Sequence, residues 1–123
     1  MLGAAHACAN PLTARYGTIH GVAVAVLLPR VVYWNAAYAR EGYAELLWAS
    51  GTACKAAEAA DRLAERVQDL AALAGLPASL RDLGVPREDL PLLAEEAAQQ
   101  WTGTFNPRKL DVGGALDIYR AAF

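Results

Sequence analysis

The chain has 123 residues, of which 55% are hydrophobic and 20% are charged, with a net charge of −2 and a mean hydropathy of +0.17. This length suits about one small domain and is too short for a complete dinucleotide-binding domain together with a separate substrate domain. The hydrophobic content excludes intrinsic disorder, and the slight excess of acids gives no overall electrostatic attraction to nucleic acid or to an anionic membrane.

The composition favours helices. The sequence has 28 Ala and 17 Leu against 15 β-branched residues, and β-branched side chains are the stiffer ones in a helix. Charge is uneven along the chain, since residues 1–40 contain no Asp or Glu and the remaining 83 residues contain all thirteen. We therefore expect an all-α bundle of about five to six helices, in which the first third is interior.

The first predicted helix covers residues 2–16 and ends at Gly17. Pro11 lies inside it and removes one helical hydrogen bond, so a kink or an early break is expected. Residues 21–39 form an apolar segment whose pattern fits a buried strand or a buried helix equally well. Pro29 and Arg30 interrupt it well short of the roughly 20 apolar residues that a membrane-spanning helix needs, so we interpret it as a core segment.

Two helices are predicted in the middle of the chain. Residues 41–50 form a short helix that Gly51 ends, and Thr52 can cap a longer helix that runs to about residue 74. An i,i+4 pair of Glu58 and Arg62 marks the exposed face of the longer helix. Its apolar stripe is spaced by four, three and four residues, and consists of Leu63, Val67, Leu70 and Ala74.

The last third is predicted to hold two more helices. One or two turns at residues 79–83 precede a helix over residues 90–101, which Asp89 caps. Residues 102–109 form a loop, and Asp111 begins a final helix that extends to residue 123.

The two cysteines, Cys8 and Cys54, are 46 residues apart and belong to no CxxC motif. We expect two reduced thiols in a cytoplasmic protein rather than a disulfide. The first residues contain no positively charged segment typical of a secretory signal.

Only two histidines occur, His6 and His20, and both lie in the acid-free first third. Each could be a core histidine bonded to the backbone, or the two could converge on a metal ion. Imidazole suits iron or zinc, but a tight site needs three or four ligands. On a helix, Asn10 shares the face of His6, whereas Cys8 points to the opposite side.

Short motifs follow one another in a fixed order along the chain. His6 is followed fourteen residues later by His20-Gly21, which begins the apolar segment containing Leu27-Leu28-Pro29. Further motifs are Asn35-Ala36, residues 80–85, residues 88–91, Asn106-Pro107-Arg108 and Ile118-Tyr119. Over nearly the whole chain this series resembles the C-terminal part of the iron-containing (group III) alcohol dehydrogenases, which have the dehydroquinate synthase-like fold.

The resemblance implies that residues 1–123 form a C-terminal helical metal-binding domain, with residues 21–39 as a buried helix. In the full enzyme a separate α/β domain holds NAD or NADP, and that domain is absent from this chain. The family's metal, Fe(II) or Zn(II), is held by one Asp and three His, and by position His6 and His20 are similar to the last two of those His ligands. The metal would act as a Lewis acid that lowers the pKa of a bound alcohol, so that a hydride can pass to the nicotinamide.

The chain departs from the family pattern at several positions. Asn10 stands where many members have a second His with a proton-relay role, and an amide cannot titrate. Ile19 replaces a common Pro, and Arg30 replaces a frequent His. The family's Asp-x-x-x-His pair is absent, as is its glycine-rich phosphate loop, for which Gly113-Gly114 is a poor substitute.

The resemblance implies a C-terminal fragment or subunit of a metal-dependent, NAD(P)-linked alcohol dehydrogenase. We expect it to be inactive alone and to need a complementing N-terminal nucleotide-binding domain or chain. One alternative is a non-enzymatic helical binding or oligomerisation module derived from that family. Another is a homo-oligomer in which two copies share a metal through two His each. Neither nucleic acid nor a membrane is expected as a partner.

Overall fold

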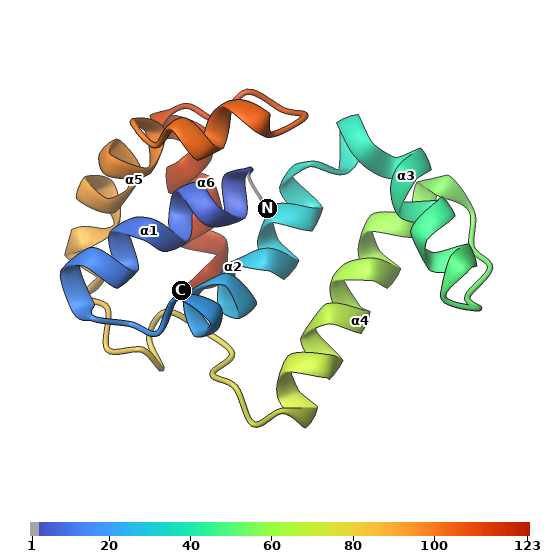
Figure 1. The fold of residues 1–123 in the computed structure, drawn as a ribbon, viewed down its shortest axis with the longest axis horizontal. Coiled ribbons are helices and arrows are strands. Elements are labelled where there is room, and N and C mark those ends of the chain that lie inside the picture. The colour runs from blue at the N-terminus through green and yellow to red at the C-terminus, as the bar shows by residue number, and fades with distance from the viewer. Residues whose placement is uncertain (1–2) are drawn as a thin grey trace.

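The computed structural model describes residues 3–123 (Figure 1). This part of the chain contains six α-helices, three short 3₁₀ helices and no strand, which confirms the predicted all-α class. The α-helices are α1 (Ala4–Tyr16), α2 (His20–Trp34), α3 (Ala36–Ala49), α4 (Ala59–Leu73), α5 (Leu90–Ala98) and α6 (Val112–Ala122). The 3₁₀ helices are η1 (Ala56–Glu58), η2 (Arg87–Asp89) and η3 (Trp101–Phe105).

The first predicted helix corresponds to α1, and the expected early break does not occur. The helix continues through Pro11, which is buried, and ends where Gly17 adopts a left-handed conformation with φ of 64°. Only glycine takes that conformation without a steric cost, which is why Gly17 correctly predicted the end of this helix. The prediction for residue 2 lies outside the described residues.

Residues 21–39 do not form a single helix, and this expectation was wrong. The segment is helical, but α2 ends at Trp34 and α3 begins at Ala36, with an angle of 110° between them. The bend lies at Asn35, which is buried and whose side chain exchanges two hydrogen bonds with Asn106, 71 residues away. The short helix predicted over residues 41–50 is therefore the second half of α3.

Thr52 does not cap the long middle helix, as the sequence suggested. Its backbone N–H donates to the carbonyl of Leu47 at 2.8 Å, and Gly51 has φ of 86°, so both residues close the end of α3. The chain then runs without regular structure to η1, and α4 begins only at Ala59.

The buried face of α4 matches only the first half of the predicted stripe. Ala60 and Ala64 form a buried cluster with Val32 of α2, and the predicted Leu63 packs against it. Leu70, further along the helix, is 51% exposed. Arg62 pairs with Glu65 at 3.8 Å rather than with Glu58. The small side chains of Ala60 and Ala64 let α4 pack close to α2. This close packing stabilises the pair of helices more than burial of the larger side chains further along α4 would.

The C-terminal part follows the prediction more closely. The Asp111 carboxylate accepts a 2.8 Å hydrogen bond from the backbone N–H of Gly114, which confirms it as the cap of α6. Asp89 makes no such cap, because its carboxylate accepts from the Tyr16 hydroxyl at 2.6 Å instead. α5 ends at Ala98, and η3 occupies the beginning of the predicted loop.

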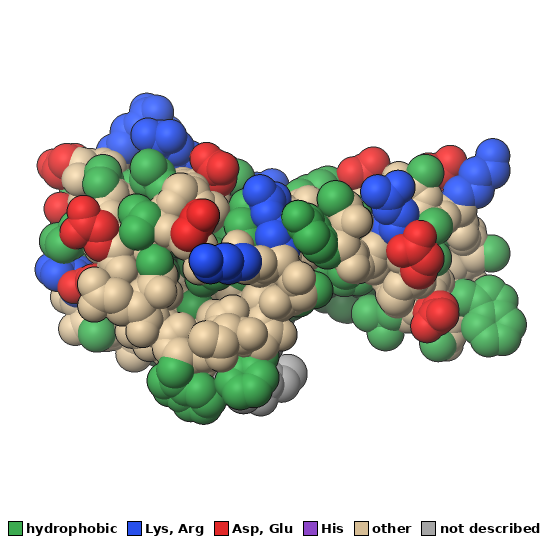
Figure 2. All heavy atoms as spheres, turned by 90° about the horizontal axis from the view of Figure 1, so that it is seen from above, with side chains coloured by type: hydrophobic (Ala, Val, Ile, Leu, Met, Phe, Trp, Pro, Cys, Tyr) green, Lys and Arg blue, Asp and Glu red, His purple; other side chains and the backbone are tan. Residues whose placement is uncertain are grey.

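Two clusters of buried side chains hold the helices together. The main core joins α1, α2, α5 and α6, and includes the fully buried Leu12, Leu27, Leu93, Ile118 and Tyr119. A small second cluster connects α2 to α4, so α3 and α4 form a lobe beside the main bundle (Figure 1). Figure 2 shows acidic and basic side chains interspersed over both lobes. The acid-free first third supplies many core residues from α1 and α2, but Ile19, Tyr33 and Tyr38 are exposed, so the expectation that it is interior holds only in part.

No single helix within residues 3–123 is both long enough and apolar enough to cross a membrane. α2 and α3 meet the length and hydropathy criteria only when taken together across their 110° bend.

Candidate metal centre

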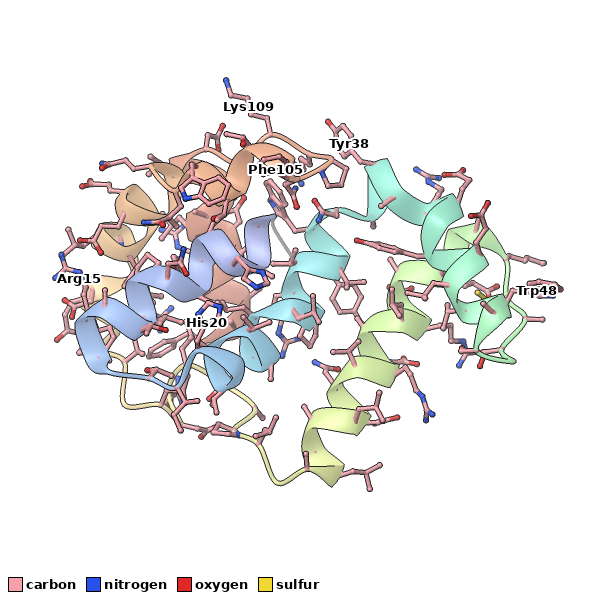
Figure 3. All side chains as sticks on the ribbon, in the orientation of Figure 1. Arg15, His20, Tyr38, Trp48, Phe105 and Lys109 are labelled. Carbon is pink, nitrogen blue, oxygen red and sulfur yellow. The ribbon has the colours of Figure 1, made fainter. Side chains whose placement is uncertain are left out.

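The two histidines come from the first two helices. His6 lies in the first turn of α1, and His20 is the first residue of α2. Residues 17–19 carry the chain back beneath α1, so that the start of α2 faces the first half of α1 (Figure 1; His20 is labelled in Figure 3). The sequence predicted that these side chains could converge, and the structure brings them together.

The two imidazole rings face each other at short range. Their centroids are 5.2 Å apart, with 49° between the ring planes, and both side chains are half-buried. Partial desolvation lowers the pKa of His6, and the nearby imidazole of His20 lowers it further. Both effects favour a neutral His6, which is the form that binds a metal ion.

Within the described residues, no group of three or more His, Cys, Asp or Glu side chains could hold a metal ion. Cys8 lies on the other side of α1, as expected, and is fully buried. Burial raises the pKa of its thiol to about 12, so it remains protonated and is a poor ligand. A zinc or iron site takes three or four protein ligands, a number that two imidazoles alone would not reach.

Asn10 lies one helical turn after His6 and on the same side of α1. Its amide donates a 2.9 Å hydrogen bond to Oε1 of Gln100, in the short segment between α5 and η3. Asn10 thus connects α1 to the residue that directly precedes η3. Its amide is not a titratable group.

Two contacts that the sequence did not predict hold α1 in place. The side chain of Asn106 accepts a 3.2 Å hydrogen bond from the backbone N–H of Ala4, two residues before His6. The Tyr119 hydroxyl donates a 2.7 Å hydrogen bond to the carbonyl of Cys8, two residues after His6. Both contacts join residues more than 100 positions apart, and no local sequence pattern reports such a pairing.

Comparison with known proteins gives the same family as the sequence motifs. The chain matches the model of the Fe-containing alcohol dehydrogenase family, C-terminal, over residues 1–123. It is 37% identical to a lactaldehyde reductase of Escherichia coli over 125 residues, covering 99% of this chain and 33% of that protein. It is 38% identical to a 1,3-propanediol dehydrogenase of Klebsiella pneumoniae, covering 99% of this chain and 32% of that protein.

Two solved structures have the same fold as this chain. A 1,3-propanediol oxidoreductase superposes with a TM-score of 0.92 at 36% identity, and an alcohol dehydrogenase from Oenococcus oeni does so with the same score at 31% identity. Each comparison covers 98% of this chain and 32% of the other. The chain thus spans about a third of the length of the relatives it matches. With its helical fold and its order of motifs, this chain belongs to the Fe-containing alcohol dehydrogenase family, of which it matches the C-terminal part.

Proposed function

We propose that this chain is the metal-binding part of an NAD(P)-linked alcohol dehydrogenase, to which it contributes His6 and His20 as two metal ligands. The observation that carries the proposal is the 5.2 Å approach of the two imidazole rings across α1 and α2. Relatives named for alcohol or aldehyde chemistry, such as an NAD-dependent methanol dehydrogenase of Bacillus methanolicus, support the reaction class.

The donor set fits a divalent transition metal such as Fe(II) or Zn(II). Both ions accept neutral imidazole nitrogens, and the lowered pKa of His6 favours that form. When bound, such a metal supplies Lewis-acid polarisation of an alcohol or carbonyl oxygen. His6 and His20 would hold it from two separate helices, while the Asn106 and Tyr119 contacts fix the backbone on either side of His6.

The remaining ligands and the nucleotide site would come from a complementing domain or chain. Gly113-Gly114 does not act as a phosphate loop, because no strand precedes it within residues 3–123 and Gly114 is packed against Trp34. We assign NAD or NADP binding to that complementing part. We also propose that the protein is cytoplasmic, because Cys8 and Cys54 are both free thiols.

Asn10 has a positioning role in this proposal. An amide cannot accept or release a proton near neutral pH, so Asn10 holds the segment at Gln100 rather than relaying a proton. Any proton that leaves the alcohol would have to depart through water or through a group of the complementing part.

The ligand assignment is tested by calorimetric titration of the 123-residue chain with ZnCl₂ and, without oxygen, with FeCl₂. We expect weak binding that is lost in His6→Gln and in His20→Gln, and that is retained in Asn10→Ala. Zinc at about 100 times its dissociation constant should stabilise the wild-type chain by about 2.7 kcal/mol. A wild-type chain whose thermal unfolding is unaffected by either metal would refute the assignment.

The incompleteness of the site is tested separately. The isolated chain should not oxidise primary alcohols with NAD or NADP, and tightly held stoichiometric metal together with turnover would contradict this. Sedimentation velocity with and without zinc tests the alternative in which two copies share the metal. Zinc-dependent dimers that His20→Gln abolishes would favour that homo-oligomer over the complemented enzyme.

A further inference from the structure

An apolar groove of about 300 Å³ lies between the main bundle and the lobe formed by α3 and α4. One wall comes from α1 and α2, and the other comes from α3 and α4 (Figure 1). The apolar side chains that line it include Ala5, Leu28, Val31, Leu46, Leu63 and Val67. Leu46 is 56% exposed, so the groove is open to solvent.

The groove contains part of the α4 stripe that the chain itself leaves incompletely buried. Leu63, Val67 and Leu70 are spaced by four and three residues, which places them on one face of the helix. Leu63 and Val67 line the groove and are half-buried, and Leu70 follows them at 51% exposure. An apolar stripe of this kind is normally covered by another helix, and α2 and α3, which pack against α4, leave this face partly open.

The lining of the groove indicates an apolar occupant. Among the described residues, no charged side chain lines it. Its two amides, Asn35 and Asn106, exchange hydrogen bonds with each other at 3.1 and 2.8 Å, so they offer little to a polar ligand. On the α1 side the lining residues are small, Ala4 and Ala5 among them, and small residues at a contact let two helices approach closely.

A second copy of this chain fits the groove poorly. A two-fold dimer brings the same patch of both copies together, and a groove that faces a groove leaves both of them empty. The relatives instead offer an occupant, since this chain spans about a third of their length. The groove also reaches Ala5, which directly precedes His6, so a helix seated in it would pass close to the imidazole pair.

We propose that this groove binds an apolar helix of the complementing part, and that this helix brings the complementing part to His6 and His20. The inference rests on the proposed function, which requires further metal ligands from that part. The occupant presents apolar side chains at i, i+4 and i+7 of one face, the pattern by which amphipathic helices fill apolar grooves.

The groove is tested with a synthetic amphipathic helix of about 20 residues, built on Ala and Lys, with Leu at i, i+4 and i+7. In an NMR titration of the ¹⁵N-labelled 123-residue chain without metal, we expect saturable shifts of the amide signals of residues 4–5, 28–32 and 63–67. A peptide of the same composition, with its Leu residues spread around the helix, should bind at least about tenfold more weakly.

Two variants give the matched comparison. Leu46→Glu places a charge in the groove and should weaken peptide binding at least about tenfold. Leu73→Glu should leave binding unchanged, because Leu73 is 83% exposed on α4 and does not line the groove. Both leucines are more than half exposed, so both variants should fold, which circular dichroism checks. Absence of saturation, or unchanged binding in Leu46→Glu, would overturn the proposal.

The identity of the occupant is tested in a chimera, in which residues 1–123 replace the matching third of the lactaldehyde reductase of Escherichia coli. Thiol labelling of Leu46→Cys, measured by mass spectrometry of the peptide that contains residue 46, should be at least about tenfold slower in the chimera than in the 123-residue chain. Labelling of Leu73→Cys should be equally fast in both. Equal labelling of Leu46→Cys in the two proteins would show that the complementing part does not cover the groove.

Other occupants would produce different results. Dimers of the 123-residue chain that Leu46→Glu abolishes, seen by sedimentation velocity, would assign the groove to a second copy and overturn the proposal. Tighter saturable binding of n-octanol than of the peptide would assign it to an acyl chain and would also overturn it. The peptide titration stands without the chimera, and all these measurements are made without metal. Loss of zinc binding would therefore refute the metal assignment alone, and an accessible residue 46 in the chimera would refute the groove alone.

Discussion

Gly114, in the first turn of α6, lies directly against the indole ring of Trp34 at the end of α2. A Cβ atom at Gly114 would lie 3.1 Å from Cε2 and 3.3 Å from Cη2 of Trp34, and closer still to Cζ2. The Trp34 ring has little freedom to move, because the guanidinium carbon of Arg108 stacks 4.0 Å from its centroid. The close approach of α6 to α2 thus depends on the absence of a side chain at residue 114.

Gly114→Ala should therefore destabilise the chain by about 1–3 kcal/mol through overpacking. Gly113→Ala is the matched control, since a Cβ there meets only an Asp111 oxygen at 3.5 Å. In that position the usual helical preference for Ala should stabilise the chain by about 0.5–1 kcal/mol. Urea denaturation of both variants measures the two changes, and equal effects of the same sign would contradict the packing argument.

Asn106 should be intolerant of an almost isosteric substitution. Its amide nitrogen donates to Oδ1 of Asn35 at 2.8 Å and to the carbonyl of Arg108 at 2.7 Å. In Asn106→Asp a carboxylate oxygen replaces the amide nitrogen and faces the Asn35 and Arg108 oxygens. We expect this to lower the free energy of unfolding by about 1–3 kcal/mol. Chemical denaturation tests this, with Asn10→Asp, whose single amide contact is to Gln100, as the milder comparison.

Tyr119 should contribute to stability through its hydroxyl as well as its ring. The side chain is fully buried, and burial raises the pKa of its hydroxyl far above the ordinary value, so it remains a donor to Cys8. Tyr119→Phe keeps the packing and removes this bond, with an expected loss of about 1 kcal/mol. Tyr38→Phe, at a side chain that is 62% exposed, should change the free energy of unfolding much less. Thermal unfolding of both variants distinguishes the two sites.

The ion pair between Arg15 and Glu96 should make stability depend on pH. Nε of Arg15 donates to Oε2 of Glu96 at 2.8 Å, and these bonds lower the pKa of the Glu96 carboxyl below its usual 4.5. A carboxyl with a lower pKa in the folded chain stabilises it above the unfolded pKa, and this contribution is lost as the pH falls through the folded pKa.

Glu96→Gln should accordingly be less stable than the wild type at pH 7, with the difference shrinking towards pH 3. Glu95→Gln provides a neighbouring exposed control and should show no such trend. Because Glu96 is solvent-accessible, the effect should weaken in high salt. A difference between Glu96→Gln and wild type that is constant from pH 7 to pH 3 would contradict the ion-pair explanation.

Features set by neighbouring residues were predictable from the sequence. Gly17 ends α1 and Asp111 caps α6, because each depends on the backbone of its own turn. The pairing of His6 with His20 was implied by motif order and then found as a ring contact.

Features set by distant residues were not predictable. The bend at Asn35 depends on Asn106, and the extent to which the predicted α4 stripe is buried depends on how closely Ala60 and Ala64 approach α2. Thr is a residue type that often caps helices, but the backbone N–H of Thr52 donates to the carbonyl of Leu47 and so ends α3 instead. Local preferences act over a few residues, and tertiary contacts outweigh them wherever the two conflict.

The short connection between α1 and α2 affects how the two imidazoles come together during folding. Only residues 17–19 separate the two helices that hold His6 and His20. The entropy of closing a loop grows with its length, so bringing these imidazoles together costs little compared with joining residues a hundred positions apart. The pair of imidazoles should therefore form early in folding, as part of a local unit that is in place before the rest of the chain.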